Sequence, residues 1–116
     1  MGMQTEYAAA EPRRAEVEAL PGATVLEFGS PWCGYCRRAQ PYIAQAFVEH
    51  ASVRHIKVAD ASGRRLGRSF GVTLWPTLVF LKDGKEFARL VRPRDSNALR
   101  EALARIDTAD CARSSS

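Results

Sequence analysis

Two cysteines, Cys33 and Cys36, are separated by two residues and follow an apolar stretch of the sequence. In the first turn of a helix, this spacing brings the two sulfurs close enough to form a disulfide bond. Cys33 would then lie at the helix N-terminus, where unpaired backbone N–H groups and the helix dipole favour a negative thiolate. We therefore predict that Cys33 is an exposed nucleophile and that Cys36 is a buried resolving thiol.

The chemistry available to such a pair is thiol–disulfide exchange. Cys33 attacks a disulfide of the substrate, a mixed disulfide forms, and Cys36 breaks it to leave a Cys33–Cys36 disulfide. The third cysteine, Cys111, belongs to a polar stretch after the last expected helix, and we interpret it as a bystander. A metal site is an alternative use of the pair, but structural zinc usually takes four ligands and no histidine has suitable spacing.

Strand-like and helix-like segments alternate around this pair. We expect them in the order helix, strand, helix, strand, helix, strand, strand and helix, over residues 11–20, 23–28, 33–50, 53–59, 60–70, 77–82, 85–91 and 95–106. Asp83-Gly84 between the last two strands is a strong hairpin signal. The order predicts an α/β domain whose central mixed β-sheet is flanked by helices on both faces.

Length and composition limit the chain to one small domain. Within its 116 residues we expect a flexible N-terminal segment over 1–10, the domain over 11–107 and a polar C-terminal tail over 108–116. No apolar stretch approaches the roughly 20 residues that a membrane span needs, so no membrane is expected as a partner. The net charge of +4 comes mostly from arginines without interleaved aromatic residues, so no nucleic acid is expected either. The first residues lack a secretory signal pattern, and we expect a reducing, cytoplasmic location.

Several of these features together resemble the thioredoxin family. The resemblance extends from Val25 to Ile106 and rests on Trp32-Cys33-Gly34-Tyr35-Cys36, Pro41, Pro76-Thr77 and the Asp-Gly hairpin. It implies a thioredoxin fold and a thiol–disulfide oxidoreductase that reduces protein substrates, in electron transport and cell redox homeostasis. It also implies that no cofactor is bound, and that NADPH supplies reducing equivalents through a thioredoxin reductase. We expect the protein to be a monomer.

The resemblance also implies roles for residues around the cysteines. Pro76 takes the place of the family's cis-proline, which packs beside the pair and lets the preceding backbone hydrogen-bond a substrate. Trp32 resembles the aromatic residue beside the attacking cysteine. Glu27 takes the place of a buried acid that relays a proton to or from Cys36. Lys57 is a candidate partner of Glu27, but a one-residue shift of register would turn it to the other face of the sheet.

Some positions depart from the usual residues of the family and bear on substrate choice. Gly34-Tyr35 lies between the cysteines where thioredoxins have Gly-Pro, and Gly-Tyr also occurs in bacterial periplasmic disulfide isomerases of the same superfamily. Gly29 replaces a tryptophan, and Trp75 replaces a smaller residue before the proline. Arg92 lies in a loop that contains glycine elsewhere in the family. We expect Tyr35, Trp75 and Arg92 to border a substrate groove that suits acidic or apolar segments.

Two other functions stay open for the same fold. One is a disulfide oxidase or isomerase, which the reduction potential of the Cys33–Cys36 pair would distinguish from a reductase. The other is a non-catalytic domain that binds partner proteins as a chaperone, in which the cysteines have no role.

Overall fold

The computed structural model describes residues 2–61 and 64–107 of the chain. Its elements are α1 (Arg14–Glu18), β1 (Ala23–Gly29), α2 (Gly34–Phe47), β2 (Arg54–Ala59), α3 (Arg65–Ser69), β3 (Thr77–Lys82), β4 (Lys85–Val91) and α4 (Ser96–Ile106). The order of helices and strands is the one that the sequence predicts. The predicted α/β fold with a central mixed sheet is confirmed.

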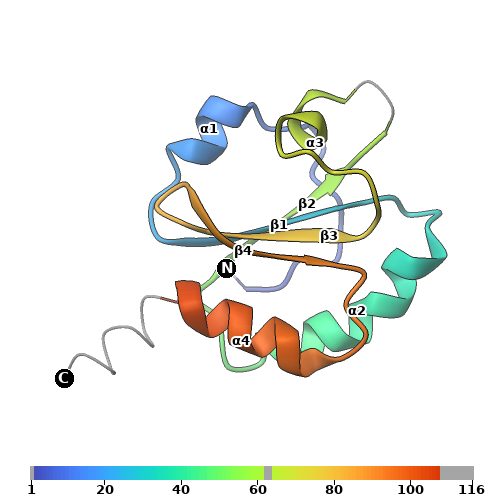
Figure 1. Cartoon of the computed structure of the whole chain (residues 1–116), viewed down its shortest axis with the longest axis vertical. Coiled ribbons are helices and arrows are strands. Elements are labelled where there is room, and N and C mark those ends of the chain that lie inside the picture. The colour runs from blue at the N-terminus through green and yellow to red at the C-terminus, as the bar shows by residue number, and fades with distance from the viewer. Residues whose placement is uncertain (1, 62–63, 108–116) are drawn as a thin grey trace.

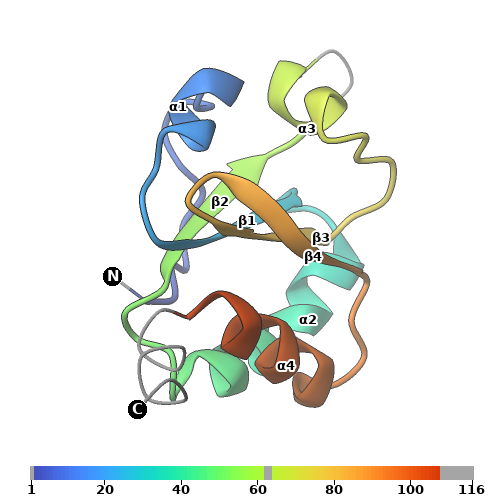
Figure 2. The same cartoon turned by 60° about the vertical axis from the view of Figure 1, so that its left-hand side comes forward.

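The strands lie in the order β2-β1-β3-β4. β1 pairs with β2 in parallel, whereas β1 with β3 and β3 with β4 are antiparallel. Figures 1 and 2 show α1 and α3 on one face of this sheet and α2 and α4 on the other. The carboxyl end of β1 therefore leads directly into the N-terminus of α2, where the two cysteines lie.

Alternation along β1 divides the core into two layers. Val25 faces the layer under α2 and α4, whereas Leu26 and Phe28 face the layer under α1 and α3. The helices contribute the apolar residues expected from their spacing. The buried residues of α2 and α4 are Cys36, Ala39, Ile43, Ala46, Phe47, Leu99, Ala102, Leu103 and Ile106.

The hairpin between β3 and β4 turns at the predicted residues. Asp83 and Gly84 have φ angles of 51° and 80°, the left-handed conformation that a two-residue hairpin turn requires. A methyl group on Gly84 would lie 2.1 Å from the Glu18 carbonyl oxygen, so the close packing of the turn on α1 also needs glycine.

α1, α2 and α3 are shorter than the sequence predicts, whereas α4 has the predicted bounds, with Asp95 as its N-cap. α1 begins at Arg14 because the backbone N–H of Arg13 donates to Glu16 Oε1 at 2.9 Å, which closes a capping box three residues after the expected start. α2 ends at Phe47, and a turn leads to His50, whose N–H donates to the Phe47 carbonyl at 3.0 Å. Within the expected 60–70 helix, only 65–69 are helical.

The N-terminal segment, for which the sequence predicts flexibility over 1–10, makes hydrogen bonds to β2 and to the residue before it. Gly2 N–H donates to the Val53 carbonyl at 3.0 Å, and Ala8 N–H donates to the Lys57 carbonyl at 2.8 Å. Residues 2–8 therefore lie along the free edge of β2, as Figure 2 shows. Backbone hydrogen bonds hold this segment, and they leave no periodic pattern in the sequence.

The predicted polar tail over 108–116, with Cys111, lies outside the described residues. Among the residues that the structure describes, no helix has the length and apolar character to cross a membrane.

Candidate active site

The loop after β1 places Cys33 at the N-terminus of α2. Cys33 is the N-cap residue, with φ −83° and ψ 119°, and its Sγ accepts a hydrogen bond from the Cys36 backbone N–H at 3.2 Å. Both cysteines are free thiols; Cys33 is partly exposed, and Cys36 is buried. A sulfur that accepts a backbone N–H at a helix N-terminus is stabilised as an anion.

The surroundings of Cys36 favour its neutral thiol. Burial, together with a hydrogen bond to the Cys33 side chain, raises the pKa of Cys36 from its ordinary value of about 9 to about 12. Cys36 is therefore protonated at neutral pH. The pair is asymmetric: the accessible sulfur is held by a donor, and the buried sulfur must lose a proton before it reacts.

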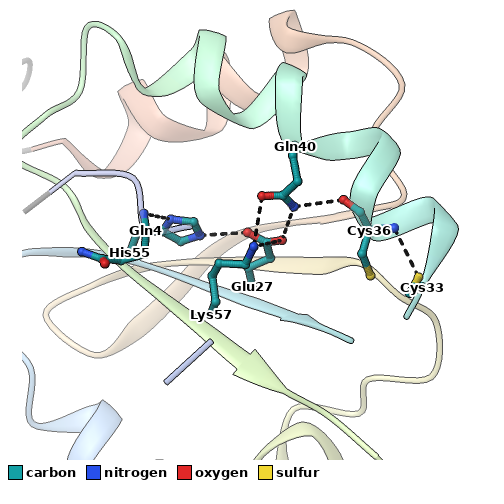
Figure 3. Close-up of polar contacts among 7 residues, drawn as sticks. All are labelled: Gln4, Glu27, Cys33, Cys36, Gln40, His55 and Lys57. Atoms are coloured by element: carbon teal, nitrogen blue, oxygen red, sulfur yellow. Dashed lines mark hydrogen bonds and ion pairs between the residues drawn. The ribbon is translucent and has the colours of Figure 1, made fainter. Parts of the chain in front are cut away.

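A polar network, which we call the Glu27 network (Glu27, Gln40, His55 and Lys57), lies under α2 next to the cysteines (Figure 3). The side chain of Glu27 is fully buried. His55 Nε2 lies 2.9 Å from Glu27 Oε1, and Gln40 Nε2 donates to Glu27 Oε2 at 2.8 Å. Lys57 Nζ lies 3.9 Å from the same Oε2. Both carboxylate oxygens thus have a partner, as a buried acid requires.

Neighbouring groups set the direction of each hydrogen bond in this network. Gln4 N–H donates to His55 Nδ1 at 2.8 Å, so the ring proton lies on Nε2 and His55 donates to Glu27. Gln40 Nε2 also donates to the Cys36 carbonyl at 2.9 Å. Gln40 Oε1 accepts from Lys57 Nζ at 3.0 Å. Gln40 therefore joins the carboxylate, the ammonium and the backbone of the resolving cysteine.

The register of β1 and β2 settles the position of Lys57, which the sequence leaves open. Glu27 and Lys57 are directly paired across the parallel strands, and both side chains lie on the α2 face. His55 and Gln40 also belong to this site, and neither is among the site residues predicted from the sequence. Strand alternation puts His55 on the same face as Lys57, and Gln40 follows Cys36 by one helical turn, so both could have been found from spacing.

The residues before β3 lie at the same end of the sheet as the cysteines. The Trp75–Pro76 peptide bond is cis, and Pro76 precedes Thr77, which pairs with Phe28 near the end of β1. The indole N–H of Trp75 donates to Asp60 Oδ2 at 2.9 Å, so this side chain is held by the loop after β2. Trp75, which the sequence predicts at the border of a substrate groove, is not among the residues that line the groove beside α2, but its backbone carbonyl accepts a hydrogen bond from Arg92 of that groove.

A groove of about 690 Å³ lies beside α2, and we call it the arginine groove (Tyr35, Arg38, Leu74, Val91, Arg92 and Arg94). It contains Tyr35 and Arg92, as the sequence predicts. The guanidinium carbon of Arg92 lies 3.9 Å from the centroid of the Tyr35 ring, and Arg92 Nε donates to the Trp75 carbonyl at 2.8 Å. Trp32, in the loop before Cys33, is 85% exposed. Gly34, the first residue of α2, is also exposed.

The metal alternative depends on further ligands near the cysteines. Within residues 2–61 and 64–107, no group of three or more histidine, cysteine or acidic side chains is arranged to hold a metal ion. The Glu27 carboxylate, the acid closest to the pair in this network, is engaged by the side-chain nitrogens of Gln40 and His55.

Comparison with known proteins gives the same fold and a family. The Thioredoxin family model matches residues 5–105. The reduced form of thioredoxin 2 from Pseudomonas aeruginosa PAO1 is similar in structure, with a TM-score of 0.79 and 52% identity over 89% of this chain and 95% of that chain. Thioredoxin of Chlamydia muridarum is 33% identical over 78 residues, which are 67% of this chain and 76% of that protein.

Disulfide isomerases are also similar, in part of their length. Human protein disulfide-isomerase A2 is 35% identical over 89 residues, which are 72% of this chain and 17% of the isomerase. Protein disulfide-isomerase A3 of Gallus gallus is 34% identical over 80 residues, 68% of this chain and 16% of that isomerase. The chain thus spans about a sixth of these relatives. With the family model covering most of its length and a redox pair at the N-terminus of α2, the chain belongs to the thioredoxin family.

Proposed function

We propose that this chain is a thiol–disulfide oxidoreductase that reduces disulfides in protein substrates. The observation that carries the proposal is the asymmetry of the cysteine pair. Cys33 Sγ is accessible and accepts a backbone N–H at 3.2 Å, whereas Cys36 is buried with its pKa raised to about 12. Such a pair supplies one attacking thiolate and one thiol in reserve.

The reaction proceeds in two exchange steps. The Cys33 thiolate attacks one sulfur of the substrate disulfide, and the other sulfur leaves as a thiolate that takes up a proton. Cys36 then loses its proton and attacks Cys33 Sγ, which releases the second substrate sulfur and leaves the Cys33–Cys36 disulfide. We assign Glu27 as the proton acceptor of this second step, because its buried carboxylate is close enough to raise the pKa of the Cys36 thiol, and Gln40 holds it next to the Cys36 backbone carbonyl.

Single-cysteine variants test this proposal. Cys33→Ser should abolish reduction of a disulfide-bonded model protein, because the attacking sulfur is lost. Cys36→Ser should stop the reaction at the mixed disulfide, which mass spectrometry of the intact complex detects. Cys111→Ser is the matched control and should leave the rate unchanged. Reduction that continues without Cys33 would contradict the proposal. A Cys33→Ser, Cys36→Ser variant that still complements a deletion strain would favour a partner-binding or chaperone domain.

The direction of exchange depends on the reduction potential of the pair. We propose that NADPH and a thioredoxin reductase restore the dithiol, which places the protein in electron transport and cell redox homeostasis. Turnover that requires both would support this. Disulfide isomerases are among the relatives, so equilibration of the Cys33–Cys36 pair with glutathione is the deciding measurement. A potential well above that of a thioredoxin would instead favour a disulfide oxidase or isomerase.

The arginine groove is the proposed binding surface for the substrate segment. Its arginines and the exposed Leu74 and Val91 suit acidic and apolar side chains. Arg92→Ala should slow reduction of an acidic disulfide peptide more than that of a basic one of equal length. Equal rates on both peptides, before and after the change, would exclude charge selection by Arg92.

The proposed setting is a reducing cytoplasm, in which the protein acts as a monomer on other proteins. Cell fractionation with trapping of the thiol state checks the compartment, because a reducing environment keeps the pair as a dithiol. Light scattering coupled to gel filtration checks the monomer.

A further inference from the structure

Tyr7 lies beside the resolving cysteine, but it is not one of the groups that carry out the two exchange steps. Its segment reaches this place because it is bound on both sides of Tyr7. Before Tyr7, Gln4 N–H donates to His55 Nδ1 at 2.8 Å. After it, Ala8 N–H donates to the Lys57 carbonyl at 2.8 Å. These two hydrogen bonds, four residues apart in the sequence, hold Tyr7 next to the Glu27 network.

The Tyr7 hydroxyl fits beside Cys36 because residue 29 has no side chain. A methyl group on Gly29 would lie 2.6 Å from Cys36 Sγ and 3.3 Å from the Tyr7 hydroxyl oxygen. The sulfur and the hydroxyl therefore lie next to one another over the bare backbone of Gly29. Any larger residue at this position would displace one of the two groups.

The ring of Tyr7 is held by the ammonium group of Lys57. Lys57 Nζ lies 4.7 Å from the ring centroid, within the range of a cation–π contact. The same nitrogen donates to Gln40 Oε1 at 3.0 Å. Tyr7, Cys36, Gln40 and Lys57 also line one cleft of about 610 Å³. The phenol thus lies beside the reacting sulfur and contacts a charged group of the Glu27 network.

We propose that Tyr7 is a further catalytic residue, whose hydroxyl donates a hydrogen bond to Cys36 Sγ as this sulfur becomes the attacking thiolate. The inference rests on the proposed exchange reaction and concerns its second step. There, Cys36 gives up its proton to the Glu27 carboxylate, its thiolate attacks Cys33 Sγ, and the bond between Cys33 and the substrate sulfur breaks. The substrate sulfur leaves with the electron pair and takes up a proton. The protein dithiol is oxidised to a disulfide, and the substrate disulfide is fully reduced.

A donor at Cys36 lowers the free energy of the thiolate at the moment it is formed. Burial and the nearby negative groups raise the pKa of Tyr7 well above its usual range, so the phenol keeps its proton and stays a donor. The other titratable groups near Cys36 Sγ are Cys33 on α2 and Glu27 on β1. Lys57 on β2 and Arg37 on α2 line the same cleft.

Rapid mixing with an aromatic disulfide that releases a coloured thiolate tests the inference. The first colour phase reports attack by Cys33, and the second reports resolution by Cys36. Tyr7→Phe removes the hydroxyl but keeps the ring on Lys57. We expect an unchanged first phase and a second phase about tenfold slower, the effect of losing one hydrogen bond to a charged group. Glu6→Gln changes an exposed neighbour in the same segment and should alter neither phase.

The pH profile separates a donor from a structural role. If the hydroxyl stabilises the thiolate, its loss shifts the second-phase profile upward by about one pH unit, and the two proteins converge as pH rises. A second phase equal in both proteins, or a slowing of both phases that is constant with pH, would overturn the role of Tyr7. Absence of a second phase in the unaltered protein would instead overturn the proposed exchange reaction.

Discussion

Two histidines of this protein are buried against a carboxylate, in two different regions. His50 Nδ1 lies 2.5 Å from Asp107 Oδ2, in a contact that joins the turn after α2 to the end of α4. His55 Nε2 lies 2.9 Å from Glu27 Oε1, in the sheet under α2. The chemical groups are the same in both pairs. The second pair differs because Gln40 connects its carboxylate with the backbone of a reactive cysteine. Among the contacts of the described residues, the first pair has no such connection.

This difference shows that burial of an acid–histidine pair is no evidence of catalysis. The Asp107 pair holds two helix ends together, and Ser52 Oγ donates to its second carboxylate oxygen at 3.3 Å. The Glu27 pair has an ammonium group at 3.9 Å and lies near a thiol that must change its protonation state. We therefore expect changes around Asp107 to affect stability, and changes around Glu27 to affect the rate of exchange.

The largest expected effect is a loss of stability at alkaline pH. It should arise from the buried thiol of Cys36, next to the Glu27 network. The pKa of Cys36 is about 12 in the folded protein and about 9 when unfolded. Between these values the unfolded chain has lost the proton and the folded chain keeps it, so the free energy of unfolding falls as pH rises. We expect a loss on the order of 1 kcal/mol per pH unit in this window.

Chemical denaturation of the reduced protein measures this loss, with Cys36→Ser as the control that lacks the titrating thiol. The two proteins should show a constant difference in stability below about pH 9, the ordinary pKa of the thiol, and diverge above it. Parallel curves across the whole range would mean that burial does not perturb Cys36.

The second effect concerns the Asp107 pair. Asp107→Leu removes both acceptors from a buried site, and we expect it to lower the free energy of unfolding by about 2 kcal/mol. Urea denaturation at neutral pH measures this change. The second-phase exchange rate of the folded variant should equal that of the unaltered protein. A slower second phase would show that the two regions are not independent.

The third effect concerns the acid of the Glu27 network. Glu27→Gln keeps the shape of the side chain but removes its negative charge and its ability to accept a proton. We expect the resolution step to slow about tenfold, or about 1.4 kcal/mol, because the resolving thiol loses its nearby proton acceptor and must give its proton to solvent instead. Single-turnover mixing measures this rate. Asp107→Asn, the same chemical change in the other pair, is the matched control and should leave the rate as it is.

The smallest expected effect concerns Gln40, which connects the Glu27 carboxylate with the backbone of Cys36. Gln40→Met removes the amide that joins Glu27, Lys57 and the Cys36 carbonyl, but it leaves the carboxylate in place. We expect a slowing of about threefold, less than 1 kcal/mol, because Lys57 is already 3.9 Å from Glu27 and can approach it. The same single-turnover experiment checks it. A loss larger than that of Glu27→Gln would mean that Gln40, and not the acid, is the main support of the resolving step.

Much of the fold follows from local patterns of the sequence. Leu99, Ala102, Leu103 and Ile106 predict the buried face of α4, and Asp83-Gly84 predicts the hairpin. The length of α1 does not follow, because its start depends on a hydrogen bond between the backbone of Arg13 and the side chain of Glu16, and several residues nearby could have closed the same capping box.

The part of the site that local spacing defines was predictable from the sequence. The part that depends on contacts between residues far apart in the sequence was not. Cys33 and Cys36 are adjacent in one helical turn, so their geometry follows from the helix. Trp75 was expected beside the groove, but its indole donates to Asp60, fifteen residues away. Tyr7 gives no periodic signal either, because its place depends on the bare backbone of Gly29 and on hydrogen bonds to β2.

The segment that brings Tyr7 to the sulfur has a second consequence, for the behaviour of the protein at high concentration. β2 is an edge strand, and an uncovered edge can pair with a strand of another molecule and start aggregation. Residues 2–8 cover part of this edge. At the opposite edge, β4 carries the charged residues Lys85, Glu86 and Arg89, which disfavour such pairing. Residues 2–8, which place Tyr7 beside Cys36, thus also cover an edge at which strands of other molecules could pair with the sheet.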